Sequence, residues 1–131
     1  HVILANSVNM GGHVEIGDWA IVGGLTAIHQ FVRIGAHAFV GGASRVPKDV
    51  APFVRAAGNP LAMAGLNAVG LRRRGFDAET RRAIKQVYRM VFTSELNVSQ
   101  AVARAREELG GQPAVDEFLT FIEASERGLA L

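Results

Sequence analysis

The chain has 131 residues, 49% of them hydrophobic, and no cysteine, so it can form a packed core but neither disulfides nor thiolate metal sites. Its formal net charge is only +2, and Gly or charged residues break every apolar run well short of a membrane span. These features favour a cytoplasmic protein with no membrane span and no nucleic-acid partner. The first residues lie inside a repeat, so we expect a fragment of a longer protein.

The first fifty residues repeat with a period of six, beginning with VILANS, VNMGGH and VEIGDW. The first residue of each hexad is small or β-branched. The third is apolar without exception: Leu4, Met10, Ile16, Val22, Ile28, Ile34, Val40 and Val46. The fourth is most often glycine: Gly11, Gly17, Gly23, Gly35 and Gly41. A helical period of 3.6 would scramble these columns, so the pattern indicates short strands.

Each hexad is expected to form a short strand followed by a tight turn, with its first and third residues facing inward. We expect the glycine of the fourth column to supply turn angles that a side chain would forbid. Such strands cannot bury their faces alone and must stack coil upon coil. Three hexads per coil resemble the left-handed parallel β-helix of the hexapeptide-repeat acyltransferases, and the handedness is taken from that resemblance.

Eighteen residues per coil place Gly12 directly against Gln30, and put His13 and His29 on the same corner of neighbouring coils. The two histidines can therefore share a site about 5 Å apart along the coil axis. His37 is displaced by a third of a turn and is expected on another corner, as a surface turn residue.

The hexad pattern ends at Val50, so residues 1–54 are predicted as β-helix coils and residues 55–131 as a loop followed by an all-α, three-helix domain. The stretch from Pro52 through Pro60 is typical of a loop. Asp77 and Asn97 are good N-caps, and Pro113 opens a third helix. The triplet Arg72–Arg74 suggests an anionic partner.

Four segments, HQFVRIGAHAFVGG, GNP, GLNAVGLRRRGF and SERGL, resemble the UDP-N-acetylglucosamine O-acyltransferase family that starts lipid A biosynthesis. The resemblance covers the whole chain. It implies transfer of an (R)-3-hydroxyacyl group from acyl carrier protein to the 3-hydroxyl of UDP-GlcNAc. It also implies homotrimers whose active sites lie between the β-helices of neighbouring subunits, and no metal or other cofactor.

The resemblance assigns roles to individual positions. The Gly12 N–H matches the oxyanion donor and His13 a supporting, sugar-contacting histidine. The remaining matches are His29, Gln30, Asn67 and Arg73 for substrate binding, Gly24 and Gly42 for the acyl-chain groove, and Arg72 and Arg74 for docking the acidic carrier protein. Gly42 leaves the groove open, so the protein is expected to accept a longer acyl chain than it would with a bulky residue at this position.

Two departures from the family limit this assignment. The general-base histidine of the family falls one coil before Gly12, ahead of His1, so the fragment is expected to be inactive alone. Val69 occupies a position where some members carry an acidic residue beside the nucleotide.

Three alternatives remain open from the residues themselves. One is a hexapeptide-repeat acyltransferase that acts on a 3-amino sugar nucleotide. Another is a metal-dependent enzyme of the carbonic anhydrase type, with His13, His29 and His37 as candidate ligands. The third is a non-catalytic scaffold that binds an acidic partner through Arg72–Arg74.

Overall fold

The computed structural model describes residues 1–131, which form two compact units. The coil unit comprises His1–Asn67 together with Ser125–Leu131, and the helical unit comprises Ala68–Ala124. None of the helices has the length and apolar character needed to cross a membrane.

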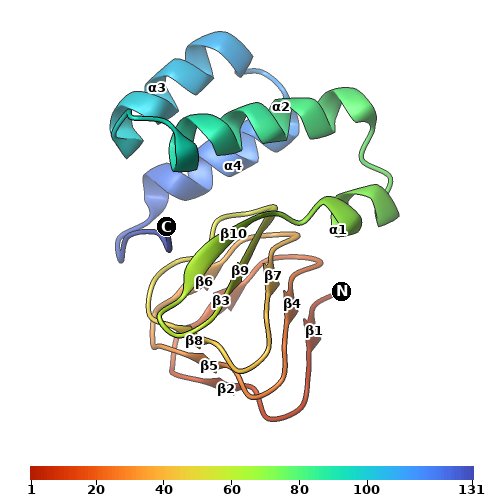
Figure 1. The fold of residues 1–131 in the computed structure, drawn as a ribbon, viewed down its shortest axis with the longest axis vertical. Coiled ribbons are helices and arrows are strands. Elements are labelled where there is room, and N and C mark those ends of the chain that lie inside the picture. The colour runs from red at the N-terminus through yellow and green to blue at the C-terminus, as the bar shows by residue number, and fades with distance from the viewer. The chain divides into compact units, whose positions relative to one another are not determined.

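The coil unit is a β-solenoid in which β1 to β8 are stacked two-residue strands (Figure 1). The first sheet contains β1 (Ile3–Leu4), β4 (Ile21–Val22), β7 (Phe39–Val40), β9 (Val54–Ala57) and β10 (Ala62–Leu66). The second contains β2 (Asn9–Met10), β5 (Ala27–Ile28) and β8 (Arg45–Val46), and the third contains β3 (Glu15–Ile16) and β6 (Arg33–Ile34). Parallel pairs such as Ile3↔Ile21 and Ile21↔Phe39 lie 18 residues apart, as three hexads per coil predict.

The inward columns form the core of this unit. Val22, Val40 and Val46 have no exposed surface, and Ile28 and Ile34 are 3% and 1% exposed. Polar members of the first column are accommodated by hydrogen bonds, because Thr26 and Ser44 both donate their hydroxyls to the carbonyl of Gly41. The predicted burial of the first and third columns is therefore found from the second coil onward.

The fourth-column glycines serve a different purpose from the one expected. Positive φ occurs instead at the sixth residue of each hexad: Ser7, His13, Trp19, Leu25, Phe31, His37 and Ala43. None of the fourth-column glycines has positive φ. A Cβ at Gly17 would lie 2.5 Å from the backbone nitrogen of Ala36 in the next coil. Glycine is needed there because the coils approach closely, and the expectation about turn angles was wrong.

The stretch expected as a loop after Val50 contains regular structure. Val50 bridges to Ile34, and Arg55 pairs with Phe39 in parallel, each at a separation of 16 residues. The third coil is therefore two residues shorter than the 18 residues of the preceding ones, and β9, which begins a fourth coil, falls outside a search at period six. β9 then turns back into the antiparallel strand β10.

The helical unit contains α1 (Ala68–Arg73), α2 (Ala78–Tyr88) with a π-helical extension η1 (Arg89–Thr93), α3 (Val98–Leu109) and α4 (Pro113–Ala124). The short α1 occupies part of the stretch expected as loop. Asp77 caps α2 by accepting the Thr80 N–H at 2.7 Å, and this bond lowers the pKa of the carboxyl. The inward faces of α2 and α4 are buried, with Ile84 and Val115 fully covered.

We expect Asn97→Ala to destabilise the protein by about 1 kcal/mol. Asn97 forms a capping box, in which its side chain accepts the Gln100 N–H at 2.8 Å and its own N–H donates to Gln100 Oε1 at 3.2 Å. Urea unfolding followed by circular dichroism measures the loss. Asn97→Ser is the matched control because serine is also a good cap, and an equal loss in both variants would contradict the capping role.

Candidate functional site

The histidine corner comprises residues 11–13 and 29–31, where the second sheet turns into the third. The Gly11 N–H donates to Ile28 O at 2.9 Å, and the Phe31 N–H donates to Gly12 O at 3.0 Å. The rings of His13 and Phe31 stack with centroids 5.1 Å apart and an interplanar angle of 6°. One coil therefore lies in register on the next, and His13 and His29 share a corner.

The Gly12 amide is available to a ligand at this corner. Gly12 is exposed, and its N–H donates no hydrogen bond within the chain. A Cβ at Gly12 would lie 3.6 Å from the side-chain nitrogen of Gln30, so the Gln30 amide group covers the adjacent space. A backbone N–H that has no acceptor within the chain and lies beside polar side chains is the kind of group that stabilises an oxyanion.

His29 is half-buried and has a partner that the sequence analysis missed. Arg45 Nε donates to His29 Nε2 at 3.2 Å. Arg45 lies on β8, one coil beyond His29 and two columns away, so the contact is diagonal across the coils. The hexad columns align residues directly above one another and give no signal for such a diagonal pair.

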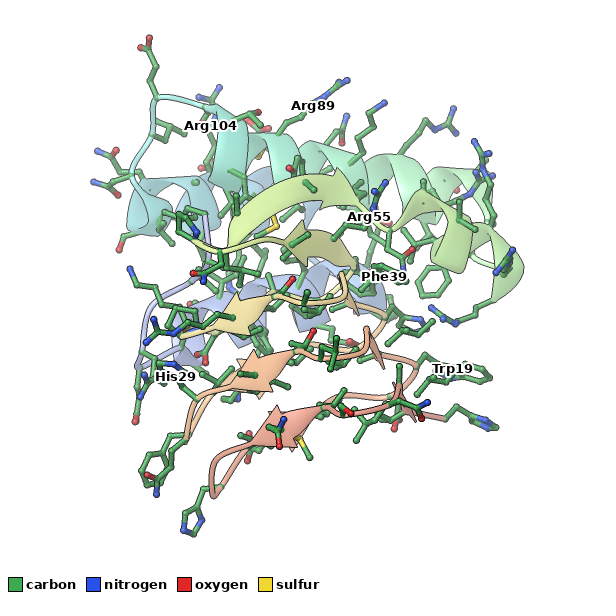
Figure 2. The ribbon with its side chains drawn as sticks, turned by 60° about the horizontal axis from the view of Figure 1, so that its bottom comes forward. Trp19, His29, Phe39, Arg55, Arg89 and Arg104 are labelled. Atoms are coloured by element: carbon green, nitrogen blue, oxygen red, sulfur yellow. The ribbon has the colours of Figure 1, made fainter.

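Asn67 lies at a different corner, which we call the aromatic corner (residues 1, 19, 37 and 53). Asn67 is 5% exposed, donates its side-chain amide to His37 O at 2.9 Å and its backbone N–H to Phe53 O at 2.8 Å. The His37 ring stacks on Phe53 with centroids 5.8 Å apart. Figure 2 shows Trp19 of this corner and His29 of the histidine corner at separate edges of the coils. His37 is thus on another corner, as expected, and one chain does not bring Asn67 to His29.

The predicted groove glycines stack on a third corner. The Ala43 N–H donates to Gly24 O at 2.8 Å, and a Cβ at Gly42 would lie 3.3 Å from that same oxygen. A side chain at Gly42 would therefore project from a tightly spaced backbone.

The three predicted arginines belong to the helical unit and differ in exposure. Arg72 and Arg73 are exposed at the end of α1, whereas Arg74 is half-buried. Partial burial, reinforced by the neighbouring charge of Arg73, lowers the pKa of the Arg74 guanidinium. Arg72 and Arg73 are accordingly better placed than Arg74 to meet an anionic partner.

The histidines do not assemble a metal site within one chain. No group of three or more His, Cys, Asp or Glu side chains could hold a metal ion. His13 and His29 occupy one corner and His37 another. The geometry therefore gives no support to the carbonic anhydrase alternative.

A pocket of about 470 Å³ opens beside β8 in the coil unit. Its lining combines two cationic side chains, Arg45 and Lys48, with the polar Asn59 and an apolar wall. The wall is formed by Pro47, Pro60, Leu61, Leu129, Ala130 and Leu131. Arg45 thus borders this pocket while it contacts His29.

Six-residue repeats coiled into stacked parallel sheets define a hexapeptide-repeat solenoid protein. The family model for domain 2 of UDP-N-acetylglucosamine O-acyltransferase matches residues 49–130. The chain belongs to the UDP-N-acetylglucosamine O-acyltransferase family.

Relatives and solved structures agree with this assignment. The acyl-[acyl-carrier-protein]–UDP-N-acetylglucosamine O-acyltransferase of Burkholderia lata is 48% identical over 133 residues, covering 98% of this chain and 51% of the relative. The UDP-N-acetylglucosamine O-acyltransferase of Moraxella catarrhalis superposes with a TM-score of 0.95 at 40% identity, covering 99% of this chain and 51% of that chain. The UDP-N-acetylglucosamine acyltransferase of Bacteroides fragilis superposes with a TM-score of 0.96 at 37% identity, covering 99% of this chain and 51% of that chain. The chain spans about half the length of these relatives.

Proposed function

We propose that the chain is the C-terminal part of an acyltransferase that moves an (R)-3-hydroxyacyl group from acyl carrier protein to the 3-hydroxyl of UDP-GlcNAc, the first step of lipid A biosynthesis. The observation that carries the proposal is the Gly12 amide, which has no hydrogen-bond acceptor within the chain and lies beside Gln30, on the corner that also carries His29, in a chain of this family. The coils are proposed to be left-handed, and the protein cytoplasmic.

The reaction needs a base, an oxyanion donor and groups that hold two substrates. In the proposed mechanism, a histidine one coil before Gly12 removes the proton from the sugar hydroxyl. The hydroxyl oxygen attacks the thioester carbonyl, and the Gly12 N–H donates to the oxygen that becomes negative. Collapse of this intermediate expels the carrier thiolate, which takes up the proton. His13, His29 and Gln30 would orient the sugar nucleotide.

The site is proposed to be completed by a second copy of the chain. Asn67 and the histidine corner lie at separate corners of one solenoid. A closed homotrimer would bring the aromatic corner of one copy to the histidine corner of the next. Asn67 and Arg73 would then contact the nucleotide, and Arg72 and Arg74 the acidic carrier protein.

The deciding experiment compares this chain with a version extended upstream by two coils. Each is incubated with UDP-GlcNAc and 3-hydroxyacyl carrier proteins of several lengths, and the products are identified by mass spectrometry. We expect an ester-linked product from the extended protein only, and sedimentation should report a trimer. A product formed only with a 3-amino acceptor would indicate the N-acyl alternative. No product with either acceptor, from a folded protein, would overturn the proposal in favour of a scaffold.

Gly42→Met is expected to shorten the preferred acyl chain of the extended protein. The new side chain would start 3.3 Å from Gly24 O and project into the proposed groove. Competition between carrier proteins with different acyl lengths, analysed by mass spectrometry, measures the preference. Gly42→Ala is the control, because its methyl group adds little length, and an unchanged preference in Gly42→Met would refute the groove.

A further inference from the structure

We propose that Arg45 is a positioning residue that fixes the tautomer and orientation of His29. This inference rests on the proposed function for its catalytic meaning, while its structural part can be tested independently. It starts from the 3.2 Å hydrogen bond between Arg45 Nε and His29 Nε2.

The protonation pattern follows from the chemistry of the two side chains. A guanidinium nitrogen can only donate, so His29 Nε2 must be an acceptor in this bond. A neutral imidazole that accepts at one nitrogen carries its proton on the other. His29 is thereby held as the Nδ1–H tautomer, and its ring orientation is set by the bond to Arg45.

The remaining nitrogen of His29 is then an available donor. The Nδ1 atom forms no hydrogen bond within the chain, and the backbone N–H of His29 is already used by Val46 O at 3.0 Å. His29 shares its corner with the unoccupied Gly12 N–H. The corner therefore offers two donors, one from the backbone and one from an oriented ring, which suit the oxygen-rich surface of a sugar nucleotide.

Arg45 is free to perform this role because no carboxylate competes for it. It forms no salt bridge, whereas Arg33, an outward arginine in the same column on the next face, pairs with Glu15 at 3.0 Å. The strand β8 holds Arg45 in place through its pairing with β5, which also carries the chain into His29. Arg45 also lines the 470 Å³ pocket, together with Lys48.

The first test reads the tautomer directly. Imidazole ¹⁵N shifts of the labelled chain are recorded at about pH 8, where an ordinary histidine is neutral, and His29 is assigned from the spectrum of His29→Gln. We expect the Nδ1–H tautomer in the wild type and in Arg33→Ala, the matched control. Arg45→Ala should release His29 to the Nε2–H form that a free imidazole prefers, and Arg45→Lys should restore part of the original population. An unchanged His29 tautomer in Arg45→Ala would overturn the proposal.

The second test measures the consequence for binding in the extended protein. Arg45→Ala should raise KM for UDP-GlcNAc by about tenfold, the loss expected for one oriented hydrogen bond, while kcat changes less than about twofold. A fall in kcat at constant KM would contradict a positioning role in substrate binding. If the extended protein forms no product at all, the proposed function fails, yet the tautomer measurement still decides whether Arg45 fixes His29.

Discussion

Gly35→Ala is expected to destabilise the coil unit by about 3 kcal/mol or more, because the backbone of the next coil occupies the space that the new methyl group needs. A Cβ at Gly35 would lie 2.3 Å from Pro52 N and 2.6 Å from Pro52 Cα. Both are backbone atoms of a proline whose ring fixes φ, so neither can move aside easily. The adjacent coil spacing is also fixed by the Gly35 N–H, which donates to Val50 O at 2.8 Å.

Urea unfolding monitored by circular dichroism measures this loss as a lower transition midpoint. Gly12→Ala is the matched control, since the nearest atom to its Cβ is a side-chain nitrogen at 3.6 Å and its φ is not positive. We expect that control to lie within about 0.5 kcal/mol of the wild type. Equal midpoints for the two alanine variants would show that close approach does not explain the glycine column.

The hexad period predicted the stacking of the coils, because the same 18-residue register is repeated from one coil to the next. The inward column that contains Val22 and Val40 is buried in the second and third coils, and the paired residues are 18 apart. The pattern could also place His13 and His29 on one corner, since that required only counting. The position of a residue in its coil, and the residue that it stacks on in the next coil, were therefore predictable by counting.

Features that depend on the meeting of different segments were not predictable in this way. The third coil shortens by two residues between Val46 and Val50, so the next strand, β9, falls outside the period. The sixth column adopts positive φ with residues such as Trp19 and Leu25, which rarely signal that conformation. The Arg45–His29 contact crosses columns and coils together. The shortened coil and the Arg45–His29 contact depend on residues from another coil rather than on local spacing.

The C-terminal segment, Ser125–Leu131, belongs to the coil unit, and the buried carboxylate of Asp49 binds it there. Asp49 is 1% exposed. Its Oδ1 accepts the Arg33 N–H at 2.8 Å, and its Oδ2 accepts the Ser125 hydroxyl at 2.6 Å. Its backbone also pairs with the same segment, donating to Gly128 O at 3.0 Å and accepting from the Ala130 N–H at 2.8 Å.

Asp49→Ala is therefore expected to destabilise the protein by about 3 kcal/mol, since it leaves a backbone N–H and a hydroxyl without their acceptor. The loss should be accompanied by faster hydrogen exchange at Ala130, because the carboxylate no longer holds Ser125 beside the coil. Urea unfolding and amide exchange measure the two effects on the same samples. Asp18→Ala, an exposed aspartate in a neighbouring turn, should change stability by less than about 0.5 kcal/mol.

Ser125→Ala separates the two bonds of the Asp49 carboxylate. It removes only the hydroxyl bond and leaves Asp49 bound to the Arg33 N–H, so we expect a loss of about 1 kcal/mol. The double variant should then lose little more than Asp49→Ala alone, because both changes delete the same contact between the segment and the coil. Fully additive losses would mean that Asp49 stabilises the coil independently of the C-terminal segment, and exchange at Ala130 would then be unaffected by Asp49→Ala.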